Sequence, residues 1–268
     1  MGIINWKEEL LPYEQAVDEI TAKLRALKRE YDAKGNHSPI EQVEGRVKAI
    51  ASIIDKANRR SVPVDKAFEV LEDIAGIRII CRFVEDITRV VELLRLRSGH
   101  DMTIIQEEDY VTNTKKSGYR SYHVTIAYPI VTSEGCREVK CEIQIRTLAM
   151  NFWATIEHSL RYKYDGNMPP ELQIRLQNCA EAAFKLDNEM TTIRDEMLQV
   201  QRTIQARDYI VKEIVNNIHN LYFHAGVEKM NQFNIRFTEL CQEGSVEKLA
   251  EFNKELETMA EIYKVKYM

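Results

Sequence analysis

The sequence contains few residues that cross-link or interrupt a chain: its 268 residues include five cysteines, six prolines and ten glycines. The five cysteines are odd in number and form no C-x-x-C pair, so neither a disulfide framework nor a structural zinc site is expected. No stretch approaches the ~18–20 consecutive apolar residues that a membrane-spanning helix needs. The opening residues, MGIINWKEELL, lack the basic and apolar regions of a signal peptide. These absences predict a cytoplasmic protein with no membrane partner.

Charge of either sign is not in excess, because 37 lysines and arginines oppose 42 aspartates and glutamates and leave a formal charge of −5. This slightly acidic total argues against a protein that coats nucleic acid, and no DNA partner is expected, although it allows a local basic pocket. Hydrophobic residues make up 44% of the chain and charged residues 29%, as is typical of globular proteins. A chain of this length can bury a sizeable core.

Two helices are predicted near the N-terminus. Apolar residues at alternating steps of four and three predict the first, and they are Tyr13, Val17, Ile20, Leu24, Leu27 and Tyr31. The segment Ser38-Pro39-Ile40-Glu41 has the pattern of a helix start, with a capping serine, a proline in the first turn and a capping-box glutamate. The second helix would bury Val43, Val47, Ile50 and Ile54. Its opposite face would carry Lys48, Ser52 and Lys56.

The middle of the chain changes to the period of β-strands. Alternating residues predict a strand over Ile77–Phe83, followed by a short helix near Ile87–Leu94 and a strand near Thr103–Ile105. Two longer strands flank the turn Ser133-Glu134-Gly135, which is typical of a hairpin. The order of helices and strands predicts an α/β fold with a mixed β-sheet flanked by helices.

The C-terminal part is predicted to be helical. Thr147 is expected to cap a helix that ends near Asp165-Gly166. A strict apolar stripe then predicts a long helix over about residues 171–205, packed on another helix of the same chain or of a partner. Gly226 and Gly244 are expected to separate further helices whose apolar stripes pack on the long helix or its copy. We therefore expect a domain over residues 1–205, with its core at about 38–165, and a helical C-terminal extension over 206–268.

One face of the second hairpin strand carries the first chemically informative pattern, formed by Lys140, Glu142, Gln144 and Arg146. The neighbouring strand offers, directly after a polar loop, Tyr119, Ser121 and His123. The competing interpretation is a solvated face of an antiparallel sheet, which alternation alone favours. An aromatic ring, an imidazole, a carboxylate and several cations on one floor are nevertheless what the binding of two nucleotides requires.

Asp73, which precedes the strand Ile77–Phe83, is the second candidate. Together with Glu142 it would suit Mg²⁺, a hard ion that prefers oxygen ligands, whereas the alternative is a turn or capping residue. The third candidate is the stripe Lys48, Ser52 and Lys56, for which a solvated helix face is the alternative. Tyr110 and Trp153 are assigned to packing.

Five motifs follow one another along the chain: SPIE with GRVK (38–48), DIAGIR (73–78), KKS with GYRSYH (115–123), EIQIRT (142–147) and FWA-x-x-EH-x-x-x-YK (152–163). In this order they resemble the synthetase domain of the RelA/SpoT family, in particular the stand-alone small alarmone synthetases of the RelQ-like branch. The resemblance covers about residues 5–205, and no hydrolase or regulatory domain is expected beside it.

The resemblance implies a nucleotidyltransferase-like fold and a GTP pyrophosphokinase, which transfers the pyrophosphoryl group of ATP to the 3′-hydroxyl of GDP or GTP and releases AMP. It implies that Asp73 and Glu142 hold Mg²⁺ and that Glu142 also accepts the proton of the 3′-hydroxyl. The residues implied for ATP are Arg46, Lys48, Ser52, Lys56 and Arg78. Those implied for GDP or GTP are Lys115, Tyr119, His123, Gln144 and Arg146.

Departures from the family pattern concern the partners. Glu108 stands where a basic residue is expected, which affects a contact to the acceptor phosphates. Gln42 and Glu44 replace an aromatic and a small hydroxyl residue in a cleft between subunits that binds an alarmone effector in some relatives. A homotetramer is expected, and an alarmone effector or single-stranded RNA stays open as a further partner. The alternative function is a non-catalytic regulator that binds RNA or guanine nucleotide and retains the synthetase fold.

Overall fold

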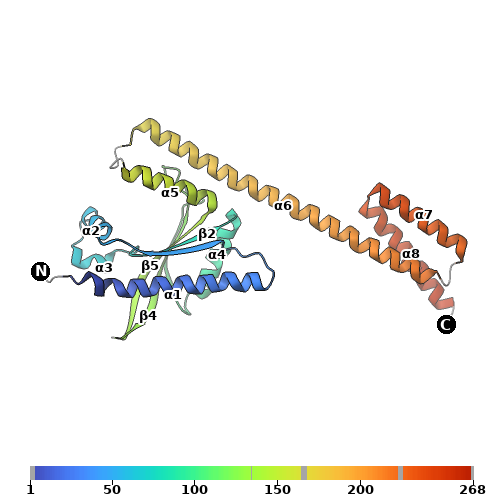
Figure 1. Ribbon diagram of the computed structural model, residues 1–268, viewed down its shortest axis with the longest axis horizontal. Coiled ribbons are helices and arrows are strands. Elements are labelled where there is room, and N and C mark those ends of the chain that lie inside the picture. The colour runs from blue at the N-terminus through green and yellow to red at the C-terminus, as the bar shows by residue number, and fades with distance from the viewer. Residues whose placement is uncertain (1–3, 134, 164–167, 223–225, 267–268) are drawn as a thin grey trace. The chain divides into compact units, whose positions relative to one another are not determined.

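The computed structural model describes residues 4–133, 135–163, 168–222 and 226–266, and its elements are labelled in Figure 1. The predicted turn residue Glu134 and the predicted helix end at Asp165-Gly166 lie outside these ranges. The chain consists of two compact units, Met1–Thr191 and Thr192–Met268. Within the described ranges, no helix combines the length and the apolar character that crossing a membrane requires.

The first unit is built on one mixed sheet with the strand order β1-β2-β5-β4-β3. β2 and β5 run parallel, whereas the other neighbouring pairs are antiparallel. The strands are β1 (Gln42–Val47), β2 (Ala75–Cys81), β3 (Thr103–Asp109), β4 (Tyr122–Thr132) and β5 (Gly135–Thr147). The predicted mixed sheet and the predicted hairpin of its two longest strands are confirmed.

Helices cover one face of this sheet and leave the other face to polar side chains. α1 (Trp6–Ala33) crosses the sheet in Figure 1 and contacts β1, β2, β4 and β5, while α4 (Val84–Arg97) contacts β2 and β5. Their apolar stripes share one core with the inward residues of the strands, among them Ile77, Ile79, Val124, Cys141, Ile143 and Ile145. The other described helices that lie wholly in this unit are α2 (Ile50–Arg59), the 3₁₀ turn Val64–Lys66, α3 (Ala67–Val70) and α5 (Leu148–Lys163).

The predicted helix that begins at Ser38 is wrong, because residues 42–47 form β1 and the helix α2 begins only at Ile50. The Ser38 hydroxyl bonds the main chain of Ile40 and caps no helix. The alternation of β1 is hidden at Gly45, where an added Cβ would lie 2.5 Å from Val17 and 2.7 Å from Thr21 of α1. A glycine is therefore required where a period-two pattern would show an apolar side chain.

The second unit is a helical bundle with an apolar core of its own. The long helix α6 (Pro170–Leu221) runs from the first unit into it and is followed by α7 (Val227–Glu243) and α8 (Val246–Lys266). The core consists of Ile214, Ile218, Leu221, Met230, Leu249, Phe252 and Leu256. The predicted helix breaks at Gly226 and Gly244 are confirmed, and Gly244 adopts a left-handed conformation with φ 76°. The last two helices pack on residues 210–221 of α6, beyond the segment that the sequence predicts.

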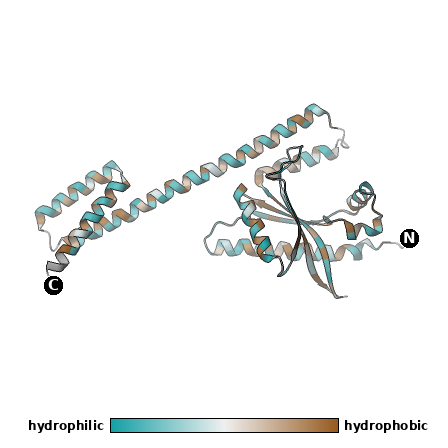
Figure 2. Cartoon of the chain, turned by 180° about the vertical axis from the view of Figure 1, so that it is seen from behind, coloured by the Kyte–Doolittle hydropathy of each residue, from teal (hydrophilic) through white to brown (hydrophobic). Residues whose placement is uncertain are grey.

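The predicted apolar stripe of the long helix is exposed within the single chain. Its exposed members include Leu186, Met190, Ile193, Met197, Val200 and Ile204, whose exposed fractions range from 40% to 68%. Figure 2 shows that hydrophobic and hydrophilic residues alternate along α6. A heptad-like stripe is typical of a helix that packs on another helix, so this surface suits self-association.

Candidate active site

The register of the strands aligns two rows of polar residues on the face of the sheet that the helices leave open. In the first row, the neighbours across β1, β2, β5 and β4 are Glu44, Arg78, Gln144 and His123. The second row, two residues along each strand, contains Arg46, Gly76, Glu142 and Thr125. Because side chains two residues apart point to the same face, the rows form one polar floor.

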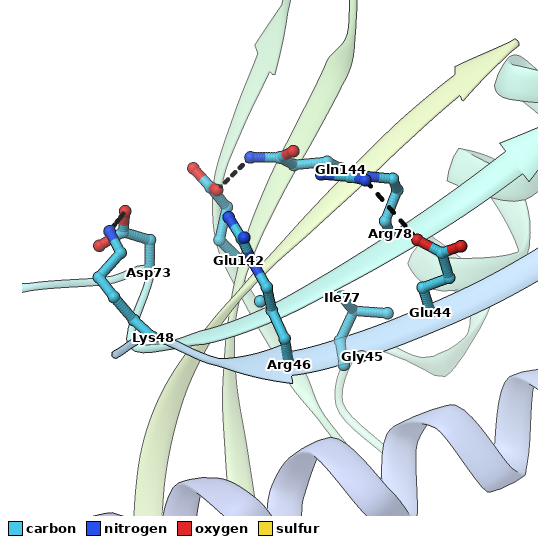
Figure 3. Close-up of a pocket in the computed structure, with 10 residues that line it drawn as sticks. Glu44, Gly45, Arg46, Lys48, Asp73, Ile77, Arg78, Glu142 and Gln144 are labelled. Atoms are coloured by element: carbon cyan, nitrogen blue, oxygen red, sulfur yellow. Dashed lines mark hydrogen bonds and ion pairs between the residues drawn. The ribbon is translucent and has the colours of Figure 1, made fainter. Parts of the chain in front are cut away.

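A cavity of about 290 Å³ opens over this floor, as Figure 3 shows. Lys48 and Asp73 lie at one end and Glu44 at the other, with Glu142 between them. Gly76 has no side chain to fill the space over the floor. A Cβ added there would meet no atom closer than 3.8 Å, so it would project into this open space. Of the residues predicted for ATP, the cavity is lined by Arg46, Lys48 and Arg78. Ser52, predicted beside them, is exposed on α2 and does not line the cavity.

Asp73 forms the anionic centre of one end of the cavity. Its Oδ2 accepts hydrogen bonds from Lys48 and from Lys56, the latter at 2.5 Å. Burial raises the pKa of this carboxyl, but the two ammonium groups outweigh that effect and the pKa is lowered overall. Its Oδ1 is buried and has no hydrogen-bond partner within the described part of the chain. An ionised carboxylate with one unpaired oxygen beside two lysines fits a site for phosphates and a hard cation.

Arginines and a glutamate form the opposite end of the cavity. Arg78 Nη1 lies 3.6 Å from Glu44 Oε2, and Gln42 donates a 2.7 Å hydrogen bond to the other oxygen of Glu44. Burial lowers the pKa of Arg78, and the positive charges of Arg146 and Arg46 lower it further. The family resemblance relates Glu44 to a cleft between subunits, and the sequence does not predict its place in this cavity.

Glu142 is held at both of its carboxylate oxygens. Gln144 Nε2 donates a 2.6 Å hydrogen bond to Oε2, and His123 Nδ1 lies 3.3 Å from Oε1. Burial raises the pKa of Glu142, but the contacts with His123 and Gln144 outweigh this and lower it overall. Glu142 is therefore an ionised, fixed carboxylate in the centre of the polar floor. This geometry suits a proton acceptor.

An aromatic and basic cluster lies next to Glu142. The Lys115 ammonium is 3.8 Å from the ring centroid of Tyr110 and 5.2 Å from that of Tyr119. Tyr110 also meets His123 edge to face at 5.2 Å, and a hydrogen bond with Glu108 raises the pKa of Tyr110 to about 12. Tyr110 is thus packed, as assigned, and it packs against the predicted acceptor residues Lys115, Tyr119 and His123. No pattern in the sequence marks Tyr110, since it directly follows β3 and the polar loop separates it from Tyr119 and His123.

Two further residues of the motifs are buried within the protein. Arg146 is only 5% exposed and donates hydrogen bonds to Ser121, Tyr119 and Gln144. Trp153 is 6% exposed and donates to the carbonyl of Leu176, in agreement with its assignment to packing. The structure thus brings the predicted residues other than Ser52 to this floor and the cluster beside it, with Arg146 enclosed among them.

The chain is similar in sequence to known alarmone synthetases. The profile described as the region found in RelA / SpoT proteins matches residues 45–167. The chain is 52% identical to the GTP pyrophosphokinase YjbM of Bacillus subtilis over 196 residues, which cover 73% of this chain and 92% of that protein.

Solved structures of similar proteins contain nucleotides. The crystal structure of small alarmone synthetase 1 from Bacillus subtilis bound to its product pppGpp matches with a TM-score of 0.68 and 52% identity, covering 71% of this chain and 97% of that one. The same synthetase bound to AMPCPP matches with a TM-score of 0.63 and 47% identity, covering 72% of this chain and 98% of that one. The predicted resemblance is thus confirmed.

Proposed function

The chain belongs to the RelA/SpoT family of alarmone synthetases, and we propose that it transfers the pyrophosphoryl group of ATP to the 3′-hydroxyl of GDP or GTP. The products are AMP and the alarmone ppGpp or pppGpp, as expected of a GTP pyrophosphokinase. The observation that carries the proposal is the fixed, ionised Glu142 beside the Asp73 end of one cavity. Transfer of a phosphoryl group requires mainly alignment and charge neutralisation, and this floor offers both.

We propose that ATP occupies the cavity between Asp73 and Glu44. Lys48 and Lys56 would exchange their contacts with Asp73 for the triphosphate, which carries more negative charge than one carboxylate. Arg46 and Arg78 would hold the adenine through stacking and cation–π contact. Ser52, which is exposed on the same helix as Lys56, stays a candidate ligand of the phosphates.

The acceptor GDP or GTP would lie on the other side of Glu142. Tyr119 would stack on the guanine, and Lys115, His123 and Gln144 would contact the ribose and phosphates. In the reaction, Glu142 would accept the proton of the 3′-hydroxyl while the 3′-oxygen of the acceptor bonds the β-phosphorus of ATP. The bond between that phosphorus and the oxygen bridging to the α-phosphate breaks, so AMP leaves with this oxygen.

A nucleotide-binding pyrophosphokinase uses a divalent metal, and we propose Mg²⁺ at Asp73 and Glu142. The unpaired Oδ1 of Asp73 supports this choice, and Mg²⁺ commonly uses one or two carboxylates with phosphates and water. When bound, the ion neutralises negative charge on the phosphate oxygens. The protein's own part is to hold the two carboxylates ionised, which the lowered pKa values of Asp73 and Glu142 support.

The long helix α6 carries an exposed apolar stripe that bears on the assembly of the protein. The exposed stripe of α6 supports self-association, and we propose a homotetramer. Its nucleotide substrates are those of the cytoplasm, where we expect the protein to act. An alarmone effector or single-stranded RNA is a candidate further partner, to be identified by its effect on the initial rate.

Incubation with ATP labelled at the γ-phosphate, Mg²⁺ and either GDP or GTP tests the function. Separation of the nucleotides is expected to reveal a labelled guanosine tetra- or pentaphosphate and AMP in equal amounts. Binding of guanine nucleotide or RNA without turnover would instead support the non-catalytic regulator. The ionised carboxylates favour the enzyme, because a binding protein has no use for a fixed base beside a cavity lined by lysine and arginine.

A further inference from the structure

Five side chains, one of them Glu142, form a closed ring of polar contacts. Glu142 Oε1 lies 3.3 Å from His123 Nδ1, and His123 Nε2 lies 2.8 Å from the hydroxyl of Tyr119. Arg146 Nη2 then lies 2.6 Å both from this hydroxyl and from Gln144 Oε1. Gln144 Nε2 closes the ring with its 2.6 Å hydrogen bond to Glu142 Oε2. Two arms therefore connect Arg146 with the two oxygens of one carboxylate.

The ends of the two arms have opposite and fixed polarity. A guanidinium only donates hydrogen bonds, whereas an ionised carboxylate only accepts them. In the short arm, the amide of Gln144 accepts from Arg146 with its oxygen and donates to Glu142 with its nitrogen. In the long arm, the Tyr119 oxygen accepts from Arg146, so its hydrogen is directed to His123 Nε2. A neutral His123 then carries its hydrogen on Nδ1 and donates it to Glu142.

Arg146 is itself firmly anchored. Its Nε donates a 3.2 Å hydrogen bond to Ser121 Oγ, and this hydroxyl is fully buried and in contact with the carbonyl of Ile145 at 3.3 Å. The Arg146 guanidinium lies 5.0 Å from the ring centroid of Tyr119, so it fixes both the hydroxyl and the plane of that ring. With 5% exposure, it offers little surface to a nucleotide.

We infer that Arg146 is a positioning residue for both the base Glu142 and the stacking ring of Tyr119, through a ring of hydrogen bonds that all run from its guanidinium to the carboxylate. The inference rests on the proposed function and replaces a direct contact between Arg146 and the acceptor. An ionised carboxylate has about four lone-pair sites. The arms occupy two of them and leave the others for the acceptor hydroxyl and a cation.

Kinetics separate this role from nucleotide binding. The hydrogen bonds of Arg146 reach Ser121, Tyr119 and Gln144 and none of the described residues proposed for ATP. Arg146→Met is therefore expected to lower kcat by about 10²-fold, the cost of a misplacement of roughly 1 Å, and to change KM for ATP far less. Arg146→Lys is expected to recover little, because a lysine lacks the planar fork that serves both arms. The matched control is Arg95→Lys, which removes an exposed arginine that also bonds a carboxylate and a tyrosine hydroxyl, those of Glu107 and Tyr122. It should leave both constants unchanged.

Variants that cut one arm each keep the test open if Arg146→Met does not fold. Tyr119→Phe cuts the long arm and Gln144→Leu the short arm. Each is expected to lower kcat, and their double variant should lose less than the product of the single effects, because both act on one carboxylate. The inference would be overturned if kcat stayed within about threefold of wild type in both single variants, since a tenfold change in rate corresponds to only ~1.4 kcal/mol.

Nuclear magnetic resonance of the full chain labelled with ¹⁵N-histidine reads the ring without any turnover. His123 is expected to show a protonated Nδ1 and an unprotonated Nε2 in wild type. In Tyr119→Phe the Nε2 resonance should shift, because its hydrogen-bond donor is lost, while the Nδ1–H toward Glu142 and the thermal stability are unchanged. An Nε2–H tautomer or a doubly protonated ring in the wild-type protein would contradict the inferred direction. If the wild-type chain makes no alarmone but shows the Nδ1–H tautomer, the proposed function fails while the ring stands.

Discussion

The two compact units of the chain bury different kinds of side chain. All the buried polar or charged residues of the described chain lie in the first unit, and they are Thr21, Asp86, Ser121, His123, Thr125, Arg146, Thr147 and Asp187. The buried core of the second unit is apolar throughout. Burial of a polar group costs free energy unless it is hydrogen-bonded, so such groups are retained where they serve geometry or chemistry. The first unit thus contains both the candidate site and buried polar groups, whereas the described core of the second unit consists of apolar side chains.

The largest effect is expected when the charge of Glu142 is removed from the first unit. Glu142→Gln keeps the shape of the side chain but removes the base, which is typically worth ~10²–10⁴-fold in rate. ATP binding should survive, as measured by calorimetry beside the initial rate. The control is Glu138→Gln, an exposed carboxylate on the same strand. Retention of more than about a tenth of the wild-type rate, where base loss costs ~10²-fold or more, would remove Glu142 from this role.

The second unit is expected to respond in stability and not in rate. Phe252 is 1% exposed in its core, and Phe252→Ala should reduce the free energy of unfolding of this unit by ~3–5 kcal/mol. Ile262→Ala on the same helix changes a side chain that is 54% exposed and serves as the control. Urea unfolding followed by circular dichroism gives the stability. A fall in kcat in proportion to the lost stability would show that the units are not separate in function.

A smaller effect is expected at the acceptor platform. Tyr119→Ala should raise KM for GDP and GTP by roughly 5- to 150-fold, the equivalent of ~1–3 kcal/mol for one base stacked on an aromatic ring. Tyr119→Phe keeps the ring, so its KM should stay near wild type even where kcat falls. Steady-state kinetics with each acceptor at saturating ATP measure both constants. An unchanged KM in Tyr119→Ala would mean that the ring packs elsewhere.

The smallest effect concerns the pH dependence of stability in the first unit. Burial raises the pKa of Asp187 to about 6, although a hydrogen bond from Thr147 opposes this. A raised pKa means that the folded state binds the proton more tightly, so this contribution is fully present below the ordinary value of 3.8 and is lost as the pH rises through about 6. Asp187→Asn should flatten the pH dependence of Tm between pH 3.8 and about 6 relative to wild type. An identical dependence in both proteins would contradict the assigned cause.

The sequence predicts elements of the fold well where side chains report the period directly. The stripe of α1, the hairpin of β4 and β5 and the breaks at Gly226 and Gly244 are all confirmed. The strand β1 could not be found, because Gly45 replaces the apolar residue that would complete the alternation between Val43 and Val47. The chain continues the long helix to Leu221 because no proline or glycine interrupts it there.

The residues of the site also divide into those that the sequence indicates and those that it does not. Motif spacing indicated Asp73, Glu142 and the cations around them, and the structure brings these residues to one floor. Motif spacing could not indicate Glu44, which enters the site through the register of β1 with β2. Nor could it indicate Tyr110, which meets His123 through the path of the loop. The ring around Glu142 likewise depends on contacts between three segments of the chain.

The division between a reacting unit and a packing unit is tested most directly by a chain that ends after Gln205. This change removes the whole apolar core of the second unit and leaves every residue of the proposed site. Initial rates with ATP and GDP, and mass by light scattering, are compared for the short and full chains. The account predicts a folded short chain with basal synthetase activity and altered assembly or stability. A short chain that keeps its fold and subunit number but loses all activity would contradict it.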